Sequence, residues 1–353
     1  MAFINIPNFK ISGISAAIPS KLLVNSDLNL LGSKEEINKF IEVTSIKQRY
    51  VVDRSGITSA DLCEAAAKEL LIESNTSTAS VEVLIFVTQT PDYLLPSTAI
   101  ILQDRLGLSK DCIAIQISLG CSGWVYGLST LLTYLSCMNA KLGILLVGDT
   151  VTMTKSPLDK STFPLFGDAG TATLVEWKEG EIGFQFHLGN DGFGHKSIII
   201  EDGGYRNPVS QESFQMRERE PGIFRNNLQS HLNGQDVFIF GITKAPFSIK
   251  SLMNHFNLTE EEIDYLILHQ ANKMMNDKIA KKVGFEGKKV PYSLHQYGNT
   301  SSASIPLTMV SQISELHHSR KRHIACGFGV GLSWGSVYFE TENLIIPEII
   351  QLN

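Results

Sequence analysis

A cysteine with glycines close on both sides is the first residue that could do chemistry. Cys121 follows the apolar run CIAIQI and precedes SGWVYGLSTLLTYLSCM, which has the composition of a helix. At such a strand-to-helix turn, free backbone N–H groups and the positive end of the helix dipole favour the thiolate over the thiol. Gly120 and Gly123 leave room for another group to approach. The pattern indicates that Cys121 is a nucleophile.

The other four cysteines have the surroundings of structural residues. Cys63 and Cys137 fall inside helical stretches, Cys112 opens a strand, and Cys326 lies at the end of an apolar strand. Five cysteines are an odd number, and none forms a C-x-x-C pair. The sequence therefore predicts neither a disulfide framework nor a structural zinc site, and it fits a reducing compartment.

The two halves of the chain share one pattern of strands and turns. VEVLIFVTQT (81–90) matches IDYLILHQAN (263–272), which places His269 opposite Thr88 at a separation of 181 residues (269 less 88). Asn299 lies opposite Cys121 at 178 residues (299 less 121). AKLGILLVGD lies opposite SRKRHIACGF at 179 residues (319 less 140). These similar offsets predict an internal duplication.

A thiol nucleophile needs a base or a cationic neighbour, and the duplication supplies candidates. Equivalent ends of two duplicated halves meet, so we expect His269 and Asn299 beside Cys121. Asn299 in YGNTSSAS would otherwise be an ordinary helix N-cap. Its place opposite Cys121 favours a catalytic amide instead. Three further histidines lie in a basic run that we expect to be exposed: His317, His318 and His323.

Short apolar runs alternate with helical stretches, which is typical of the α/β class. The runs with the composition of buried strands are 81–88, 113–117, 142–148, 265–269 and 323–327. We expect residues 1–177 to form an N-terminal half with Cys121, and 236–353 a C-terminal half with His269 and Asn299. The polar segment 178–235 between them has the composition of a loop, and we expect it to cap an entrance.

The composition narrows the choice of partners. The net charge is −6, from 30 basic and 36 acidic side chains mixed along the chain, so we expect no nucleic-acid partner. The hydrophobic content of 43% is enough for a large core. The N-terminus lacks the features of a signal peptide, and no apolar run could span a bilayer. We therefore expect a cytoplasmic protein without membrane insertion.

Several motifs together resemble the thiolase-fold condensing enzymes, most closely the β-ketoacyl-acyl-carrier-protein synthase III group. The resemblance covers nearly the whole chain, and its motifs are LGCSG (119–123), ILHQAN (267–272), YGNTSSAS (297–304), FGDAGTA (166–172) and GFGVGLSWGS (327–336). It implies an α/β thiolase fold, in which duplicated α/β halves pack as five layers, αβαβα.

The resemblance also implies a reaction. Cys121 would take an acyl group from an acyl-CoA or acyl-carrier-protein thioester, with no cofactor and no metal. A malonyl thioester would then lose carbon dioxide, and its carbanion would attack the acyl-cysteine to give a 3-oxoacyl product, in fatty acid initiation or in a specialised lipid or polyketide pathway. Backbone N–H groups of Cys121 and Val330 would form the oxyanion hole. His269 and Asn299 would stabilise the enolate.

Other residues take roles from the same resemblance. The family is dimeric, and Leu95 matches a residue that closes the partner's acyl pocket. Asn272, Phe328 and Gly329 would contact the substrate. Lys273, Lys281 and Lys282 would dock an acyl carrier protein. A non-elongating acyltransferase, which passes the acyl group from Cys121 to an amine or alcohol, is the alternative; the presence of both His269 and Asn299 favours condensation.

Overall fold

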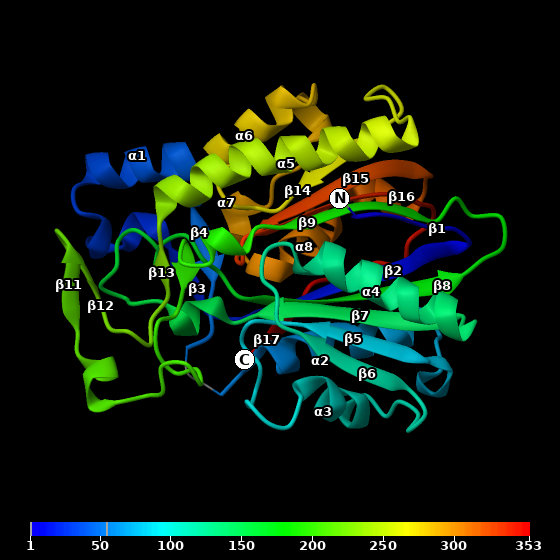
Figure 1. The fold of residues 1–353 in the computed structure, drawn as a ribbon, viewed down its shortest axis with the longest axis horizontal. Coiled ribbons are helices and arrows are strands. Elements are labelled where there is room, and N and C mark those ends of the chain that lie inside the picture. The colour runs from blue at the N-terminus through cyan, green and yellow to red at the C-terminus, as the bar shows by residue number, and fades with distance from the viewer. Residues whose placement is uncertain (1, 54–55) are drawn as a thin grey trace.

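Two mixed β-sheets form the body of the molecule in the computed structural model, which describes residues 2–53 and 56–353 (Figure 1). The first sheet has the order β17 (Ile350–Leu352), β2 (Phe9–Pro19), β8 (Ala169–Trp177), β7 (Leu142–Asp149), β5 (Val83–Val87) and β6 (Ile113–Ile117). The second has the order β1 (Ala2–Ile6), β9 (Phe184–Asn190), β16 (Ser333–Thr341), β15 (Lys321–Gly329) and β14 (Tyr265–Leu268).

The two sheets repeat one strand order. The series β2, β8, β7, β5 in the first sheet corresponds to β9, β16, β15, β14 in the second. In each series the first two neighbouring pairs are antiparallel and the last pair is parallel. The five strands expected from apolar runs all form, and the duplication seen in the sequence is visible in the sheets. Strand β9 lies inside the segment that we expected to connect the halves, because its alternate residues Phe184 and Phe186 are buried in the core.

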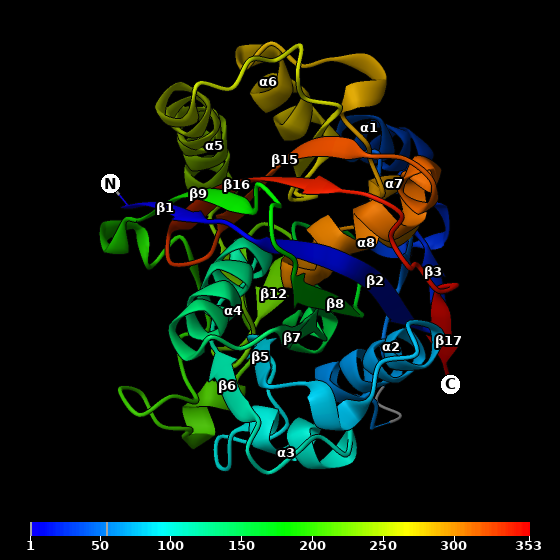
Figure 2. The ribbon, with the colours of Figure 1, turned by 90° about the vertical axis from the view of Figure 1, so that its right-hand side faces the viewer.

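Helices lie between the sheets and on both outer faces (Figure 2). The central layer holds α4 (Gly123–Met138) and α8 (Ser304–Gln312), which contact strands of both sheets. The outer face of the first sheet is covered by α2 (Ser59–Glu73) and α3 (Thr98–Arg105), and that of the second by α5 (Gly234–Phe256) and α6 (Lys273–Lys282). The expected five-layer αβαβα fold is confirmed. Two further helices are α1 (Lys34–Thr44) and the short α7 (Leu294–Tyr297).

Burial on both sides explains the composition of the central elements. Strand β5 is buried at every position and has parallel neighbours on both sides, so its sequence VLIFV is continuously apolar rather than alternating. Helix α4 buries Trp124, Leu128, Leu131 and Leu135 because sheets lie on both of its sides. Strand β5 ends next to Thr88, and α4 begins two residues after Cys121.

Two segments lie outside the duplicated pattern and pair with each other. One is the loop 150–165, which includes a 3-10 turn, Val151–Thr154. The other, residues 191–233, is named here the cap. Its strand pairs are β10 (Ile198–Ile199) with β13 (His231–Leu232) and β11 (Arg217–Glu220) with β12 (Ile223–Arg225). A third small pair, β3 (Leu22–Val24) with β4 (Gln48–Tyr50), lies in the N-terminal part.

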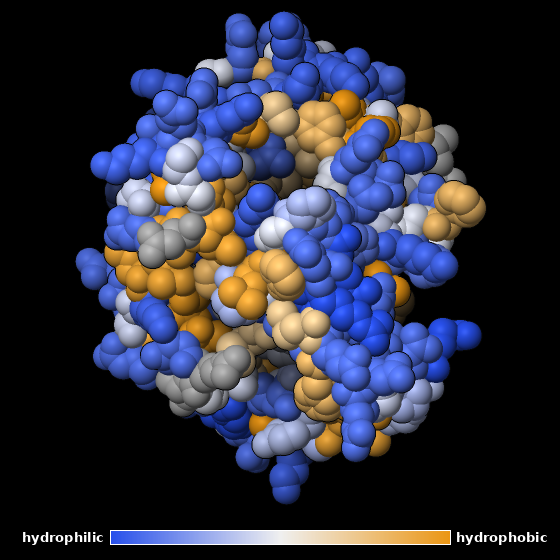
Figure 3. Space-filling view, turned by 90° about the vertical axis from the view of Figure 1, so that its left-hand side faces the viewer, coloured by the Kyte–Doolittle hydropathy of each residue, from blue (hydrophilic) through white to orange (hydrophobic). Residues whose placement is uncertain are grey.

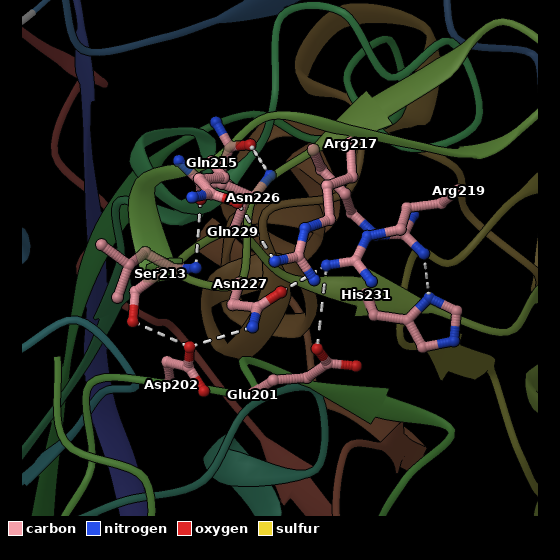
Figure 4. Close-up of polar contacts among 12 residues, drawn as sticks. Glu201, Asp202, Ser213, Gln215, Arg217, Arg219, Asn226, Asn227, Gln229 and His231 are labelled. Atoms are coloured by element: carbon pink, nitrogen blue, oxygen red, sulfur yellow. Dashed lines mark hydrogen bonds and ion pairs between the residues drawn. The ribbon is translucent and has the colours of Figure 1, made fainter. Parts of the chain in front are cut away.

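Polar contacts give the cap a fixed shape. Asn227 accepts a hydrogen bond from Arg219 and donates one of 3.0 Å to Asp202, which also accepts from Ser213 (Figure 4). The loop and the cap are joined by a 3.2 Å ion pair between Arg225 and Asp159, and by a 2.8 Å bond from the Ser230 N–H to the Thr154 carbonyl. The side of the molecule that carries β11 and β12 is hollowed, and hydrophobic residues gather on part of it (Figure 3).

Candidate active site

A cavity of about 350 Å³ lies where the two halves, the loop 150–165 and the cap meet. Cys121, His269 and Asn299 all line it. Each follows the carboxyl end of a strand or a turn at the same edge of the two sheets: Cys121 comes after β6 and His269 directly after β14. Other lining residues come from the cap and loop, including Val151, Lys155, Ile198, Ile199, Ile200, Ser230 and Leu232. The cap therefore borders the cavity, as expected of a segment that covers an entrance.

Cys121 is buried, with 8% of its surface exposed, just ahead of the first turn of α4. Burial raises the pKa of its thiol to about 11, and the nearby carboxylate of Asp149 acts in the same direction. This direction is opposite to the lowered pKa expected from the helix N-terminus, because burial removes water from the sulfur. The resting nucleophile is a thiol.

Backbone N–H groups nevertheless point at the sulfur. Those of Val330 and of Cys121 itself favour the charged form, as does the Ser301 hydroxyl. Strand β15 can approach this closely because Gly329 has no side chain: a Cβ there would lie 2.8 Å from Sγ. The turn after β15 is fixed by Ser333, which donates to the Val330 carbonyl over 2.8 Å.

His269 is buried and neutral. Its Nδ1 lies 2.7 Å from the hydroxyl oxygen of Ser304, the first residue of α8. That oxygen also accepts a hydrogen bond of 3.4 Å from the Gln270 N–H, so Ser304 contacts both the ring and the backbone that follows it. Burial lowers the pKa of His269 to about 3, against a hydrogen bond with the Ser301 backbone that raises it, so at neutral pH the ring is an uncharged imidazole.

Asn299 is held by its backbone and by one side-chain bond. Its N–H donates to the Leu165 carbonyl over 2.9 Å, and its carbonyl accepts from the Gly167 N–H over 3.1 Å. The side-chain oxygen Oδ1 accepts a 2.9 Å bond from the Ser301 N–H. This bond orients the amide and leaves Nδ2 with no protein partner in the described parts of the chain. Asn299 can therefore donate a hydrogen bond to a ligand in the cavity.

Asp149 joins the two halves beneath the site, and sequence reasoning missed it. Its carboxylate accepts from the Gln89 N–H over 2.7 Å and from the hydroxyl of Ser302 over 2.7 Å. Burial raises its pKa. It thereby fixes the turn after Asn299 against the end of β7. The signal was present: Asp149 is a carboxylate at the end of the apolar strand LGILLVGD, at the edge where Cys121 lies.

Lys155 was also missed, and it lines the cavity together with Cys121. Only 7% of the residue is exposed. Its Nζ lies 2.6 Å from the Ser230 hydroxyl and 4.0 Å from the centre of the Phe166 ring. No signal in the sequence distinguishes it, because a lysine in a polar loop is normally exposed.

The other predicted substrate residues divide into two groups. Phe328 and Gly329 line the cavity. Leu95 does not; it is 80% exposed on the surface of this chain. Asn272 is the N-cap of α6, where its side chain accepts a 2.8 Å bond from the Met275 N–H.

The residues expected to dock a carrier protein lie on α6. Lys273 pairs with Asp277 at 2.5 Å, and Lys282 donates to the Ile242 carbonyl over 2.7 Å. Lys281 is exposed in the last turn of the helix.

One expectation about the remaining histidines is wrong. His323 is fully buried in β15, not exposed, because the basic run leads directly into a core strand.

The five cysteines are all free. Among the residues that the structure describes, no group of three or more His, Cys, Asp or Glu side chains could hold a metal ion. Within the same residues, no helix has the length and apolar character needed to cross a bilayer.

Comparison with known proteins gives matches along nearly the full length. Residues 115–192 match the family described as 3-oxoacyl-[acyl-carrier-protein (ACP)] synthase III, and residues 253–341 match its C-terminal part. The chain is 30% identical to β-ketoacyl-[acyl-carrier-protein] synthase III of Rhodopirellula baltica, over 95% of this chain and 99% of that protein. It is 31% identical to the Streptococcus agalactiae enzyme of the same name, over 93% and 98%.

The fold is also similar to a solved structure. The crystal structure of 3-oxoacyl-(acyl-carrier protein) synthase from Burkholderia xenovorans LB400 superposes with a TM-score of 0.92, at 32% identity and 99% coverage of both chains.

Proposed function

The chain belongs to the β-ketoacyl-[acyl-carrier-protein] synthase III family of condensing enzymes, and on that premise we propose that Cys121, His269 and Asn299 perform a decarboxylative Claisen condensation. Cys121 is the nucleophile, and the other two residues stabilise the enolate. The observation that supports this assignment is that one cavity holds a buried thiol, a neutral imidazole and a free amide donor, contributed by both halves.

The first step loads the enzyme. The Cys121 sulfur attacks the carbonyl carbon of an acyl thioester, and the donor's thiol leaves with the proton that Cys121 gives up. The tetrahedral oxyanion is stabilised by the backbone N–H groups of Cys121 and Val330, which also favour negative charge on the neighbouring Cys121 sulfur. Because the resting thiol is protonated, loading becomes faster as the pH rises.

The second step forms the carbon–carbon bond. The Nε2–H of His269 and the Nδ2–H of Asn299 donate to the thioester oxygen of a malonyl group, which becomes an enolate as carbon dioxide leaves. The carbanion attacks the acyl carbon, and the bond from that carbon to Cys121 breaks. A neutral imidazole suits this role because it donates a hydrogen bond without holding the malonyl carboxylate by charge. Loss of one such donor costs about 3–4 kcal/mol of barrier.

The partners follow from the family. We propose acyl-CoA or acyl-carrier-protein donors and a malonyl-carrier-protein extender, with α6 as the docking surface through Lys273, Lys281 and Lys282. A homodimer is supported by the loop before α3, where Leu94 and Leu95 are 77% and 80% exposed. Residues 1–177 and 236–353 act as the two functional halves, with 178–235 between them, in a cytoplasmic enzyme.

One experiment tests loading and condensation separately. The protein is incubated with acyl-CoA and acyl-carrier-protein thioesters, and the mass of the intact chain is followed against a Cys121→Ala control. Malonyl-carrier protein is then added. Loss of the adduct with release of carbon dioxide and a 3-oxoacyl product is the expected result. An adduct that reacts with amines or alcohols but never with malonyl donors would identify the non-elongating acyltransferase instead.

A further inference from the structure

The proposed mechanism leaves one charged group in the cavity without a role. Lys155 lies in the loop 150–165, which has no counterpart in the duplicated pattern, and its ammonium is buried beside the Phe166 ring. An ammonium has three N–H donors. Within the described chain one hydrogen bond of Lys155 Nζ is present, the 2.6 Å contact with Ser230. A buried cation with unused donors is unfavourable unless something else binds to it.

The three carboxylates whose charge favours the protonated form of Lys155 already have other partners. Asp159 is paired with Arg225 at 3.2 Å and accepts from Ser161. Asp168 accepts from the Val52 N–H at 2.9 Å and from Thr152.

The third of these carboxylates, Asp149, is bound by Gln89 and Ser302. All three favour the charged form of Lys155 from a distance, but none forms a hydrogen bond with Nζ among the contacts of the described residues. The lysine therefore remains a cation with donors available to a ligand.

The ammonium is directed at the cavity that contains Cys121. Lys155 also borders a second hollow of about 300 Å³, lined by Lys21 and Asp53 among others. Its two contacts decide between the hollows, because Ser230 and Phe166 line the Cys121 cavity and not the second one. Cys121 lines the same cavity as Lys155, so one ligand in that cavity can contact both groups.

We propose that Lys155 and Ser230 form a carboxylate-binding subsite for the acyl group that is loaded on Cys121, so that the primer is a short acyl chain with a carboxylate at its far end. The wall also has apolar residues, among them Val151, Ile198 and Leu232, which can contact the methylene groups of the chain. This inference rests on the proposed function, because it needs Cys121 to accept an acyl group. It adds the chemical class of the substrate.

A carboxylate of the malonyl extender fits this subsite less well. That carboxylate leaves as carbon dioxide, so a cation that holds it stabilises the ground state and not the transition state. Decarboxylation would become slower. The far carboxylate of a primer keeps its charge throughout the reaction, so binding to Lys155 orients the chain without opposing the chemistry.

The test compares two thioesters of equal chain length. Succinyl and butyryl groups, each offered on CoA and on acyl carrier protein, are loaded on Cys121, and the rates are followed by the mass of the intact protein. The variants are Lys155→Met, Lys155→Arg and Ser230→Ala. The matched control is Lys160→Met, an exposed lysine in the same loop. Thermal unfolding of each variant shows whether it is folded.

We expect the wild type to load succinyl faster than butyryl. The ratio of the two rates falls by roughly 10- to 100-fold in Lys155→Met, the effect of losing a charged hydrogen bond, and is kept in Lys160→Met. Lys155→Arg keeps more of the preference than Lys155→Met because it keeps the charge.

Four results would overturn the inference. Equal slowing of both thioesters in Lys155→Met would mean that the lysine acts on the Cys121 thiol. A change confined to the KM of the malonyl donor would place the extender at Lys155. Butyryl loading without any preference for succinyl in the wild type would remove the subsite and leave the proposed function intact. If neither thioester loads, although iodoacetamide labels Cys121, the proposed function fails and this inference fails with it.

Discussion

Replacement of Gly329 by alanine tests the close approach of β15 to the nucleophile. An added Cβ would lie 2.7 Å from the Cys121 Cβ and 2.8 Å from its Sγ. Ordinary contact between such atoms is about 3.5–4.0 Å, so one side must shift by roughly 1 Å. The backbone at Gly329 is not in the left-handed region, so alanine is tolerated there apart from this contact. The added methyl group would therefore displace the Cys121 thiol and the Val330 N–H.

The expected result is a loss of reactivity greater than the loss of stability. A displacement of about 1 Å at reacting atoms can lower a rate on the order of 100-fold, and we predict that size for acyl loading of Gly329→Ala. Rapid mixing with an acyl thioester, followed by mass measurement of the intact protein, gives the rate. Thermal unfolding shows whether the variant is folded.

Gly192→Ala is the matched control, because a Cβ there meets nothing within 4 Å and the residue does not have a positive φ. It should load at the wild-type rate. If folded Gly329→Ala also loads at that rate, the spacing between β15 and Cys121 does not control the chemistry, and the oxyanion-hole assignment of Val330 loses its geometric support.

Three further predictions concern the charge states of the site. Ser304→Ala removes the group that fixes the His269 ring, so decarboxylation of the malonyl donor should fall roughly 10-fold, with a smaller effect on loading; equal effects on both steps would argue against the Nε2 assignment. The rate of iodoacetamide labelling of Cys121, measured in a Cys137→Ala background, should rise continuously from pH 6 to pH 10, because the thiolate reacts and the pKa of the thiol is about 11; a plateau near pH 7 would show that the pKa is lowered. Lys155→Met should raise the free energy of unfolding by roughly 1–3 kcal/mol at pH 7, because burial lowers the pKa of the lysine from 10.5 to about 8. That penalty is fully present below pH 8 and disappears as the pH rises towards 10.5, so an equal gain at pH 7 and pH 11 would refute its electrostatic origin.

The residues of the proposed catalytic set could be predicted from the sequence because the duplication is encoded in local patterns. Strands end at Ile117 and Leu268, and the residues that follow such ends meet at one edge of the sheets whatever the details of packing. The spacing of the motifs therefore predicted that Cys121, His269 and Asn299 lie near one another, and all three line one cavity. Apolar runs locate the strands, and the order repeated in the two sheets brings their ends to one edge.

Properties that depend on surroundings could not be predicted in the same way. The position of Cys121 before a helix suggested a lowered pKa, but the sign is set by how much water reaches the sulfur, and that depends on β15 and on the cap. His323 was misassigned for the same reason: its neighbours in the sequence are basic, and its neighbours in space are the rings of the buried Phe339 and the partly buried Tyr265.

Lys155 and the reactive groups come from different parts of the fold, and this separates the chemistry of the site from its choice of substrate. The reactive groups come from the duplicated halves, which are rigid because both sheets and the central helices fix them. Lys155 and Ser230 come from the two segments outside the duplication, and these are joined to each other through Arg225 and Asp159. Changes in the loop or the cap can therefore alter the acyl group that is bound without moving Cys121. A buried lysine at this position lowers the stability of the fold. Such a cost is expected of a site that selects a charged substrate.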